Sequence, residues 1–157
     1  MKRLLIALAL VLPSCGFQPV YAPGGSANFV SGNITVAEIP GRSGHMLRRA
    51  LQQELAAGLP NLEGPATLTV KIDENLTRLQ FMPDGAASRS SYIAHGFYTL
   101  SAESSSITGD AGAETSFSVP DSPYGDISAQ TSAADRTMRQ LASRIVDDMR
   151  LKLSTKN

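Results

Sequence analysis

Hydrophobic and polar residues alternate along four stretches of the chain, a pattern that is typical of half-buried β-strands. The stretches are residues 33–39, 66–77, 91–104 and 115–119. In the third stretch apolar side chains fall on both faces, which predicts a central strand that is covered on both sides. Turn signals at Pro83-Asp84-Gly85 and at Gly109 to Gly112 separate the last three stretches and predict a meander of three strands.

Two other stretches repeat apolar residues at helical spacing. The first predicted helix runs from His45 to Leu59, with Ser43 as its N-cap. The second runs from Ser132 to Leu153, where Ser132 and Asp135 resemble a capping box. Its apolar stripe comprises Ala134, Met138, Leu141, Ala142, Ile145, Met149 and Leu153. This order of elements predicts one α+β domain over residues 33–157, with two helices packed on one face of a small mixed sheet of about four strands.

The start of the chain has a different pattern. Lys2 and Arg3 precede an apolar run, Leu4 to Leu12, that is too short to span a bilayer as a helix. The run ends in Leu12-Pro13-Ser14-Cys15, with a small residue directly before the one cysteine of the chain. This layout predicts a secretory signal peptide over residues 1–14. It also resembles the lipobox of bacterial lipoproteins, whose cysteine receives a diacylglycerol on sulfur and a further acyl chain, such as palmitate, on its freed amine.

A chain with one cysteine cannot form an internal disulfide, so we expect Cys15 to carry a covalent lipid. Several acyl chains hold a protein stably at a membrane, whereas one chain binds only marginally. Residues 15–32 then form the lipidated start and a linker to the domain. Two other interpretations stay open, namely cleavage elsewhere that leaves Cys15 a free thiol, and a short buried helix with a core cysteine. Phe17, Val20 and Tyr21 either fix the linker to the domain or a partner, or are incidental.

Charge and motifs exclude several classes of function. Lys2 and Arg3 belong to the predicted signal peptide, so the 14 Lys and Arg residues fall to 12 against 14 Asp and Glu, a net charge of −2. That balance argues against a nucleic-acid partner. After the signal peptide, no apolar run approaches the length of a membrane span.

Catalytic and metal-binding patterns are equally weak. The nearest match to a nucleophile elbow is Gly41-Arg42-Ser43-Gly44-His45, which has His where the last Gly belongs. His45 and His95 are far apart in sequence and have no neighbouring ligands, so no metal site is predicted. Asp147 and Asp148 point apart on a helix and predict a solvated face. We therefore expect a protein that is not an enzyme and that has no cofactor beyond the lipid on Cys15.

Taken together, these features resemble the LptE family of lipopolysaccharide-assembly lipoproteins in Gram-negative bacteria, in an alphaproteobacterial form. The resemblance covers nearly the whole mature chain and rests on its length, its order of elements and three stretches. These are Cys15-Gly16-Phe17-Gln18-Pro19-Val20-Tyr21, the loop Leu79-Gln80-Phe81-Met82-Pro83-Asp84-Gly85-Ala86 up to Tyr92, and Ser122-Pro123-Tyr124 leading through Gln130 and Ala134 to Leu153.

The resemblance implies a non-catalytic, lipid-anchored subunit of the outer-membrane lipopolysaccharide translocon. Such a subunit plugs the LptD β-barrel, helps the barrel to assemble, and binds lipopolysaccharide for insertion into the outer leaflet. Gly16 after the cysteine fits sorting to the outer membrane. The basic residues that contact lipopolysaccharide in the family do not map cleanly, so Arg78, Arg89 and Lys71 are candidates, with ordinary surface charge as the alternative. A second hypothesis is an auxiliary lipoprotein of another envelope lipid-transport complex, and a third is a lipid-anchored hydrolase that uses Ser43.

Overall fold

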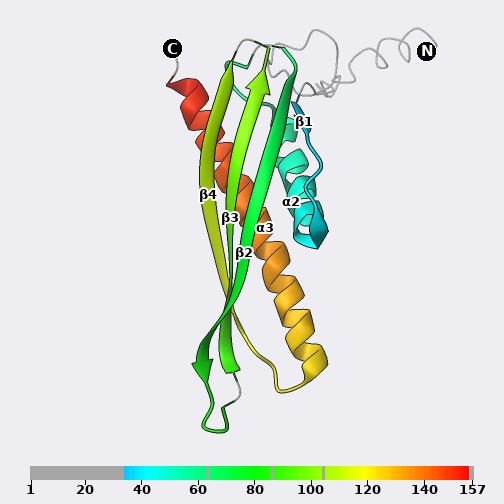
Figure 1. The fold of residues 1–157 in the computed structure, drawn as a ribbon, viewed down its shortest axis with the longest axis vertical. Helices are drawn as coiled ribbons and strands as arrows, with labels where there is room; N and C mark the ends of the chain where they lie inside the picture. Colours follow the sequence, from blue (N-terminus) through cyan, green and yellow to red (C-terminus); the bar gives the residue numbers. More distant parts are fainter. Residues whose placement is uncertain (1–33, 63, 86, 104, 156–157) are drawn as a thin grey trace, which may run out of the picture.

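The computed structural model describes residues 34–155 except 63, 86 and 104. The predicted signal peptide, Cys15 and the linker over residues 15–32 lie outside the described residues. In chain order, the elements are β1 (Ile34–Val36), α2 (Gly41–Glu54), the short 3-10 helix η2 (Leu55–Ala57), β2 (Ala66–Phe81), β3 (Ala87–Ala102), β4 (Ser106–Ser118) and α3 (Pro123–Ser154). The predicted order of strand, helix, three strands and helix is confirmed (Figure 1).

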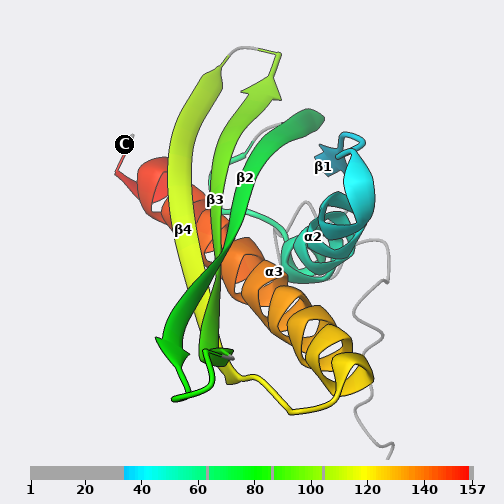
Figure 2. The same ribbon diagram turned by 60° about the horizontal axis from the view of Figure 1, so that its bottom comes forward.

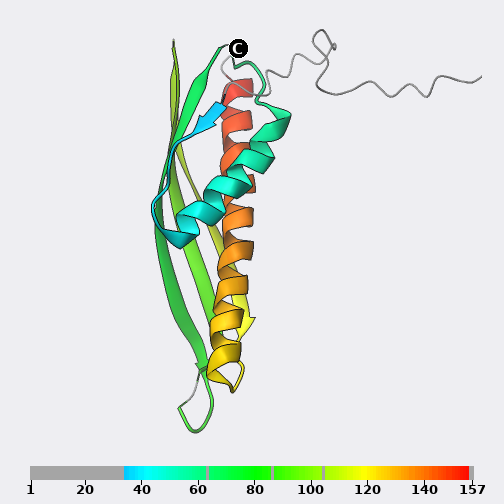
Figure 3. The ribbon, with the colours of Figure 1, turned by 90° about the vertical axis from the view of Figure 1, so that its right-hand side faces the viewer.

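The four strands form one mixed sheet in the order β1-β2-β3-β4. β1 runs parallel to β2, with Ile34 opposite Ala66, and the other two pairings are antiparallel. Both helices lie on the same face of this sheet, as Figures 2 and 3 show. The predicted α+β class, with two helices on one face of a four-stranded mixed sheet, is therefore confirmed.

The core lies between the sheet and the two helices. All seven residues of the predicted α3 stripe are buried, and so are Leu47, Ala50, Leu51 and Leu55 of the first helix and η2. On the sheet, the side chains of Leu68, Val70, Tyr98 and Leu100 face them. Burial of each large aliphatic side chain contributes about 1.5–3 kcal/mol, which explains why the apolar periodicity located these elements correctly.

The opposite face of the sheet differs from the prediction. Phe97 in β3 is 56% exposed, and His95 beside it is also exposed. β3 lies between β2 and β4, so the predicted central strand is confirmed. Among the described residues no element covers this side of the sheet, so the prediction that the strand is covered on both faces was wrong. Apolar residues such as Ile93 and Phe97 suggested a second layer, but only the face that carries Ala94 and Tyr98 packs against helices.

The second predicted turn was also wrong. Gly109 and Gly112 lie inside β4, and the chain reverses between β3 and β4 instead, where the Ala102 amide donates to the Ser105 carbonyl oxygen at 2.8 Å. A Cβ atom at Gly109 would lie 2.6 Å from both the Asp148 carboxylate and the Tyr98 hydroxyl. Gly109 is therefore required by a close approach to α3, and not by a turn.

Both predicted helix caps were wrong. α3 begins at Pro123, where the Ser122 hydroxyl oxygen accepts a hydrogen bond from the Gly125 amide at 3.1 Å. Ser132 lies in the interior of α3 and Ser43 in the first turn of α2, whose N-cap, Pro40, makes no side-chain capping bond. The first turns of α3 contain many polar residues, so the apolar periodicity did not extend to them and the predicted helix began too late. None of the described helices contains an uncharged apolar stretch of the length that a bilayer crossing requires.

Candidate functional site

A cleft of about 390 Å³ is lined by residues of the β2–β3 hairpin and of the segment that leads into α3. These two parts of the chain lie at the lower end of Figure 1. We call it the hairpin-end cleft. Its lining contains a cation, two carboxylates and apolar side chains, from residues Arg78, Phe81, Met82, Gly85, Ala87, Val119, Pro120, Asp121 and Asp126. Such a mixture of charged and apolar groups in one concave surface suits an amphipathic ligand.

Local sequence features determine the position of both walls of the cleft. On one side, the Gly85 amide donates to the Met82 carbonyl oxygen at 2.9 Å, and Gly85 has a φ of 85°, which closes the hairpin turn as predicted. The pairing register shifts between Arg78 and Gln80, which bends the end of β2. On the other side, the Ser122 cap and Pro123 fix where α3 starts.

Arg78 and Asp126 form the polar centre of the cleft. Arg78 Nη2 lies 3.5 Å from Asp126 Oδ2, and Arg78 Nη1 donates to Ser90 Oγ at 3.4 Å. Asp126 lies in the first turn of α3, where the helix dipole favours a negative charge. Its second oxygen, Oδ1, is buried and has no hydrogen-bond partner within the described residues. The pair is long and partly exposed, so Asp126 compensates the charge of Arg78 weakly.

Large exposed apolar side chains gather around the same end of the molecule. Seven such side chains are exposed among the described residues, and five of them belong to the end of the hairpin or the start of α3: Leu79, Phe81, Met82, Tyr124 and Ile127. Tyr124 is 84% exposed. A cluster of five large apolar side chains that are exposed to solvent is typical of a surface that contacts a lipid or a protein partner.

The three predicted cations do not form one site. Arg78 lines the cleft on the helix-covered side, because its partner across the ladder is the buried Ser90. Arg89 lies at the same end but points to the other face, since neighbouring residues of a strand alternate. Lys71 lies opposite Phe97, seven residues and about 23 Å along β2 from Arg78. The structure therefore places Arg78 and Arg89 at the hairpin end and Lys71 elsewhere.

Ser43 belongs to a separate polar group. Its hydroxyl lies 3.2 Å from that of Tyr92, which donates to Glu74 Oε2 at 2.6 Å, beside a cavity of about 160 Å³. Burial, and then the bond to Glu74, raises the pKa of Tyr92. His45 is exposed two residues along α2, and His95 lies on the opposite face of the sheet. Neither histidine is brought beside Ser43, as a hydrolase would need.

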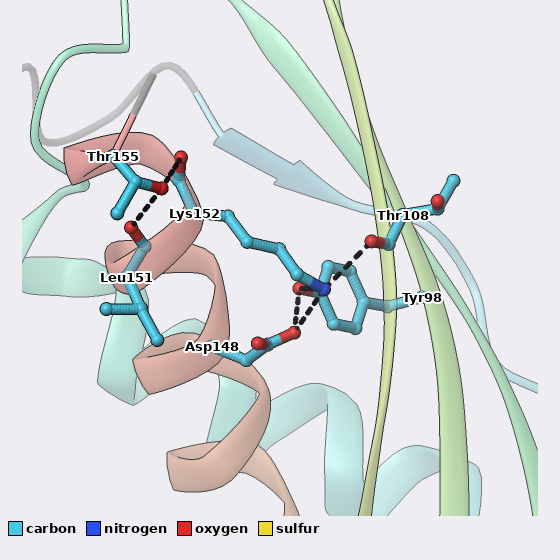
Figure 4. Close-up of polar contacts among 6 residues, drawn as sticks. All are labelled: Tyr98, Thr108, Asp148, Leu151, Lys152 and Thr155. Atoms are coloured by element: carbon cyan, nitrogen blue, oxygen red, sulfur yellow. Dashed lines mark hydrogen bonds and ion pairs between the residues drawn. The ribbon is translucent and has the colours of Figure 1, made fainter. Parts of the chain in front are cut away.

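Asp147 and Asp148 behave differently from one another. Asp147 is exposed and pairs with Arg150 at 3.1 Å, as the predicted solvated face requires. Asp148 instead accepts hydrogen bonds from the Tyr98 hydroxyl at 2.5 Å and from Lys152 at 2.7 Å, so the prediction for Asp148 was wrong (Figure 4). Burial opposes ionisation of Asp148, but the bonds from Lys152 and Tyr98 outweigh it and lower the pKa of Asp148. This group joins α3 to the sheet and touches no cleft described above.

Several residues of the hairpin-end cleft were not among the sequence candidates, chiefly Asp126, Phe81 and Met82. The signal that points to Asp126 is Ser122-Pro123, a cap followed by the residue type that is preferred at the first helical position. No group of three or more His, Cys, Asp or Glu side chains suited to a metal ion occurs in the part of the chain that the structure describes.

Solved structures of bacterial lipoproteins share this fold. A lipoprotein from Caulobacter crescentus aligns with a TM-score of 0.64 at 21% identity, over 79% of this chain and 92% of that one. Rare lipoprotein B from Shewanella oneidensis aligns with a TM-score of 0.57 at 10% identity, over 78% and 96% of the two chains. A minor lipoprotein from Acinetobacter baumannii gives 0.55 at 14% identity, over 76% and 94%. No protein-family profile and no curated protein sequence matches the chain.

Proposed function

We propose that this chain is a non-catalytic, lipid-anchored subunit of the outer-membrane lipopolysaccharide translocon, seated in the lumen of an LptD-type β-barrel. The observation that carries the proposal is the shared fold with rare lipoprotein B, a name of the LptE family, over most of both chains. The lipobox-like Leu12-Pro13-Ser14-Cys15 supplies the anchor independently of the fold. A small domain with a net charge near zero suits a large barrel, whose interior is polar and in some cases plugged.

The hairpin-end cleft suits the proposed ligand. Lipopolysaccharide combines phosphates with acyl chains, and the cleft combines Arg78 with exposed apolar side chains such as Phe81. A guanidinium group binds phosphate through charge-assisted hydrogen bonds. Arg89 lies at the same end, within reach of a ligand that extends past the hairpin.

The cleft and the first described residue, Ile34, lie at opposite ends of the sheet. β1 starts at Ile34 opposite Ala66, whereas the cleft lies at the other end of β2, around Phe81. The 15 residue steps from Ala66 to Phe81 span roughly 50 Å as a strand. The cleft therefore belongs to the end of the domain that is remote from Ile34, where the segment that leads from Cys15 joins the domain.

A detergent pull-down of the full-length tagged chain from outer membranes tests the proposal. We expect a near-stoichiometric β-barrel several times larger than this chain, identified by mass. Recovery of membrane-bound protein without such a barrel would leave lipidation standing and reject the translocon role. Partners from an inner-membrane-linked complex would instead favour an auxiliary lipoprotein of another envelope lipid-transport complex.

Ligand binding is tested separately with purified lipopolysaccharide. Reversal of both hairpin-end charges, Arg78→Glu with Arg89→Glu, should weaken binding strongly, while Lys71→Glu should have little effect because Lys71 lies far from the cleft. Unchanged binding by the double variant, with its fold intact by circular dichroism, would remove both arginines from the proposed site.

A further inference from the structure

One face of the sheet is covered by no helix of the described residues, and it is built differently from the hairpin end. It consists of rows of three residues, one each from β2, β3 and β4, that the strand register places side by side. We call it the open face. Five rows run from the β3–β4 turn toward the hairpin: Thr67-Ser101-Ser106, Thr69-Thr99-Thr108, Lys71-Phe97-Asp110, Asp73-His95-Gly112 and Asn75-Ile93-Glu114.

Hydroxyl and charged groups dominate this surface, and one large apolar side chain is strongly exposed at its centre. Phe97 is 56% exposed and lies between Lys71 and Asp110 in its row. Aromatic residues are enriched at the centres of protein–protein interfaces, whose rims are polar. A lipid surface is excluded as the occupant, because it would desolvate the hydroxyl and charged groups without pairing them.

Charge decides against a second copy of this chain. The five rows carry three carboxylates, from Asp73, Asp110 and Glu114, against one ammonium group, from Lys71. Two open faces placed against each other would bring these carboxylates together, and like charges across an interface are strongly unfavourable. The occupant must therefore present hydroxyl, amide and basic groups.

Side chains from α3 partly cover the β4 edge of the sheet. On β4, Lys152 Nζ donates to the Thr108 carbonyl oxygen at 3.0 Å, and Arg144 donates to the carbonyl oxygen of Gly112. These two side chains occupy acceptors that an added strand would need. At the other edge, β1 pairs with β2 only from Ala66 to Leu68. The β4 edge is therefore a poor site for an added strand.

We propose that the open face, centred on Phe97, is the surface through which this chain binds the inner wall of its barrel partner. This inference rests on the proposed function and names which side of the domain meets the barrel. The five rows span nine residues on each of three strands and cover roughly 430 Å², about half of the approximately 800 Å² that each partner contributes to a standard interface. The interior wall of a large barrel is polar, which matches a face made mostly of hydroxyl and charged groups.

The test uses the full-length lipidated chain, tagged and co-expressed with its barrel. Phe97→Ser should lower barrel recovery at least tenfold, and Phe97→Tyr should restore it. Leu151→Ser is the matched control, since Leu151 is 62% exposed but lies on α3, and it should change recovery less than twofold. Equal recovery with Phe97→Ser and Leu151→Ser would overturn the inference.

A photocrosslinking variant tests the same contact while keeping an aromatic ring at position 97, so it does not depend on whether Phe97→Ser folds. Benzoylphenylalanine at position 97 resembles the native ring and should form an adduct with the mass of the barrel. A wild-type chain that recovers the barrel while position 97 gives no adduct would overturn the inference and leave the proposed function standing. A wild-type chain that recovers no barrel would reject both.

Discussion

The hydroxyl of Tyr98 donates a hydrogen bond to the carboxylate of Asp148 at 2.5 Å, although the two residues are 50 positions apart in the sequence. Tyr98 comes from β3 and is almost fully buried, and Asp148 comes from α3. Lys152 completes the group by donating to Asp148 at 2.7 Å and to the Thr108 carbonyl oxygen at 3.0 Å (Figure 4). These bonds fix the rotation of α3 against the sheet and thereby place Asp126, 22 residues earlier on the same helix.

The stability of the domain should fall in acid because of Asp148. Its pKa is below the ordinary value of 3.8 in the folded state, so its contribution is present above that value and is lost as the pH falls through the folded pKa. We expect urea unfolding of Asp148→Asn to show a weaker dependence on pH between about 5 and 2 than the wild type. The exposed neighbour supplies the control, Asp147→Asn. An equal loss of pH dependence in both variants would contradict the role of Asp148.

Gly109 should be intolerant of any side chain. A Cβ atom there would lie 2.6 Å from the Tyr98 hydroxyl and equally close to the Asp148 carboxylate, and it would also clash with Lys152 Nζ. Gly109→Ala should therefore destabilise the domain by about 1–3 kcal/mol, as overpacking typically does, and lower the melting temperature measured by circular dichroism. The matched control is Gly112→Ala on the same strand, whose Cβ would meet only the exposed ring of His95 at 3.0 Å and the Ala94 carbonyl oxygen at 3.8 Å. Equal melting temperatures would contradict this account.

The sequence predicted those parts of the fold that depend on local periodicity. Leu68 and Val70 alternate with polar neighbours, and Met138, Leu141 and Ile145 recur at helical spacing, so burial of one face per element was visible in the chain itself. The prediction at Gly109 was wrong because two different structural requirements, a turn and a close approach of another element, both select glycine. A turn is a local cause, whereas the approach of Asp148 and Lys152 depends on a helix that follows much later.

The candidate site was less predictable for a related reason. Arg78 could be named from its charge, but its ion pair with Asp126 joins residues 48 positions apart and requires both the strand register and the true start of α3. The sequence pattern predicts that start at Ser132, six residues after Asp126. The exposure of one face of β3 was not predicted, because phenylalanine is usually a buried residue type and Phe97 therefore suggested a covering layer. No local pattern in the sequence shows whether such a layer is present.

Ser122 should stabilise the start of α3, and Ser132 should not. The Ser122 hydroxyl accepts the Gly125 amide, so Ser122→Ala should cost about 1 kcal/mol and speed hydrogen exchange in the first turn of α3. Ser132→Ala, an exposed position in the helix interior, should be neutral or slightly stabilising because Ala has the higher helix propensity. Greater destabilisation by Ser132→Ala than by Ser122→Ala would show that the helix begins where the sequence pattern placed it.

Asp126 should restrain anion binding in the hairpin-end cleft. Its Oδ2 lies 3.5 Å from Arg78 Nη2, so a phosphate that approaches Arg78 meets a competing carboxylate. Asp126→Asn keeps the shape of the side chain and removes its charge, and we expect it to tighten the binding of lipopolysaccharide several-fold at low salt, with a smaller gain at high salt.

The matched control for this prediction is Asp121→Asn. Asp121 lines the same cleft but is not the ion-pair partner of Arg78, so the substitution removes the same charge and leaves the Arg78–Asp126 pair in place. A gain confined to Asp126→Asn, and abolished when Arg78→Gln is added, would assign the effect to the ion pair. Equal gains in both variants would mean that the cleft responds only to net charge. A loss of affinity in Asp126→Asn would instead mean that Asp126 positions Arg78 for the ligand, because the guanidinium would then have only Ser90 to orient it.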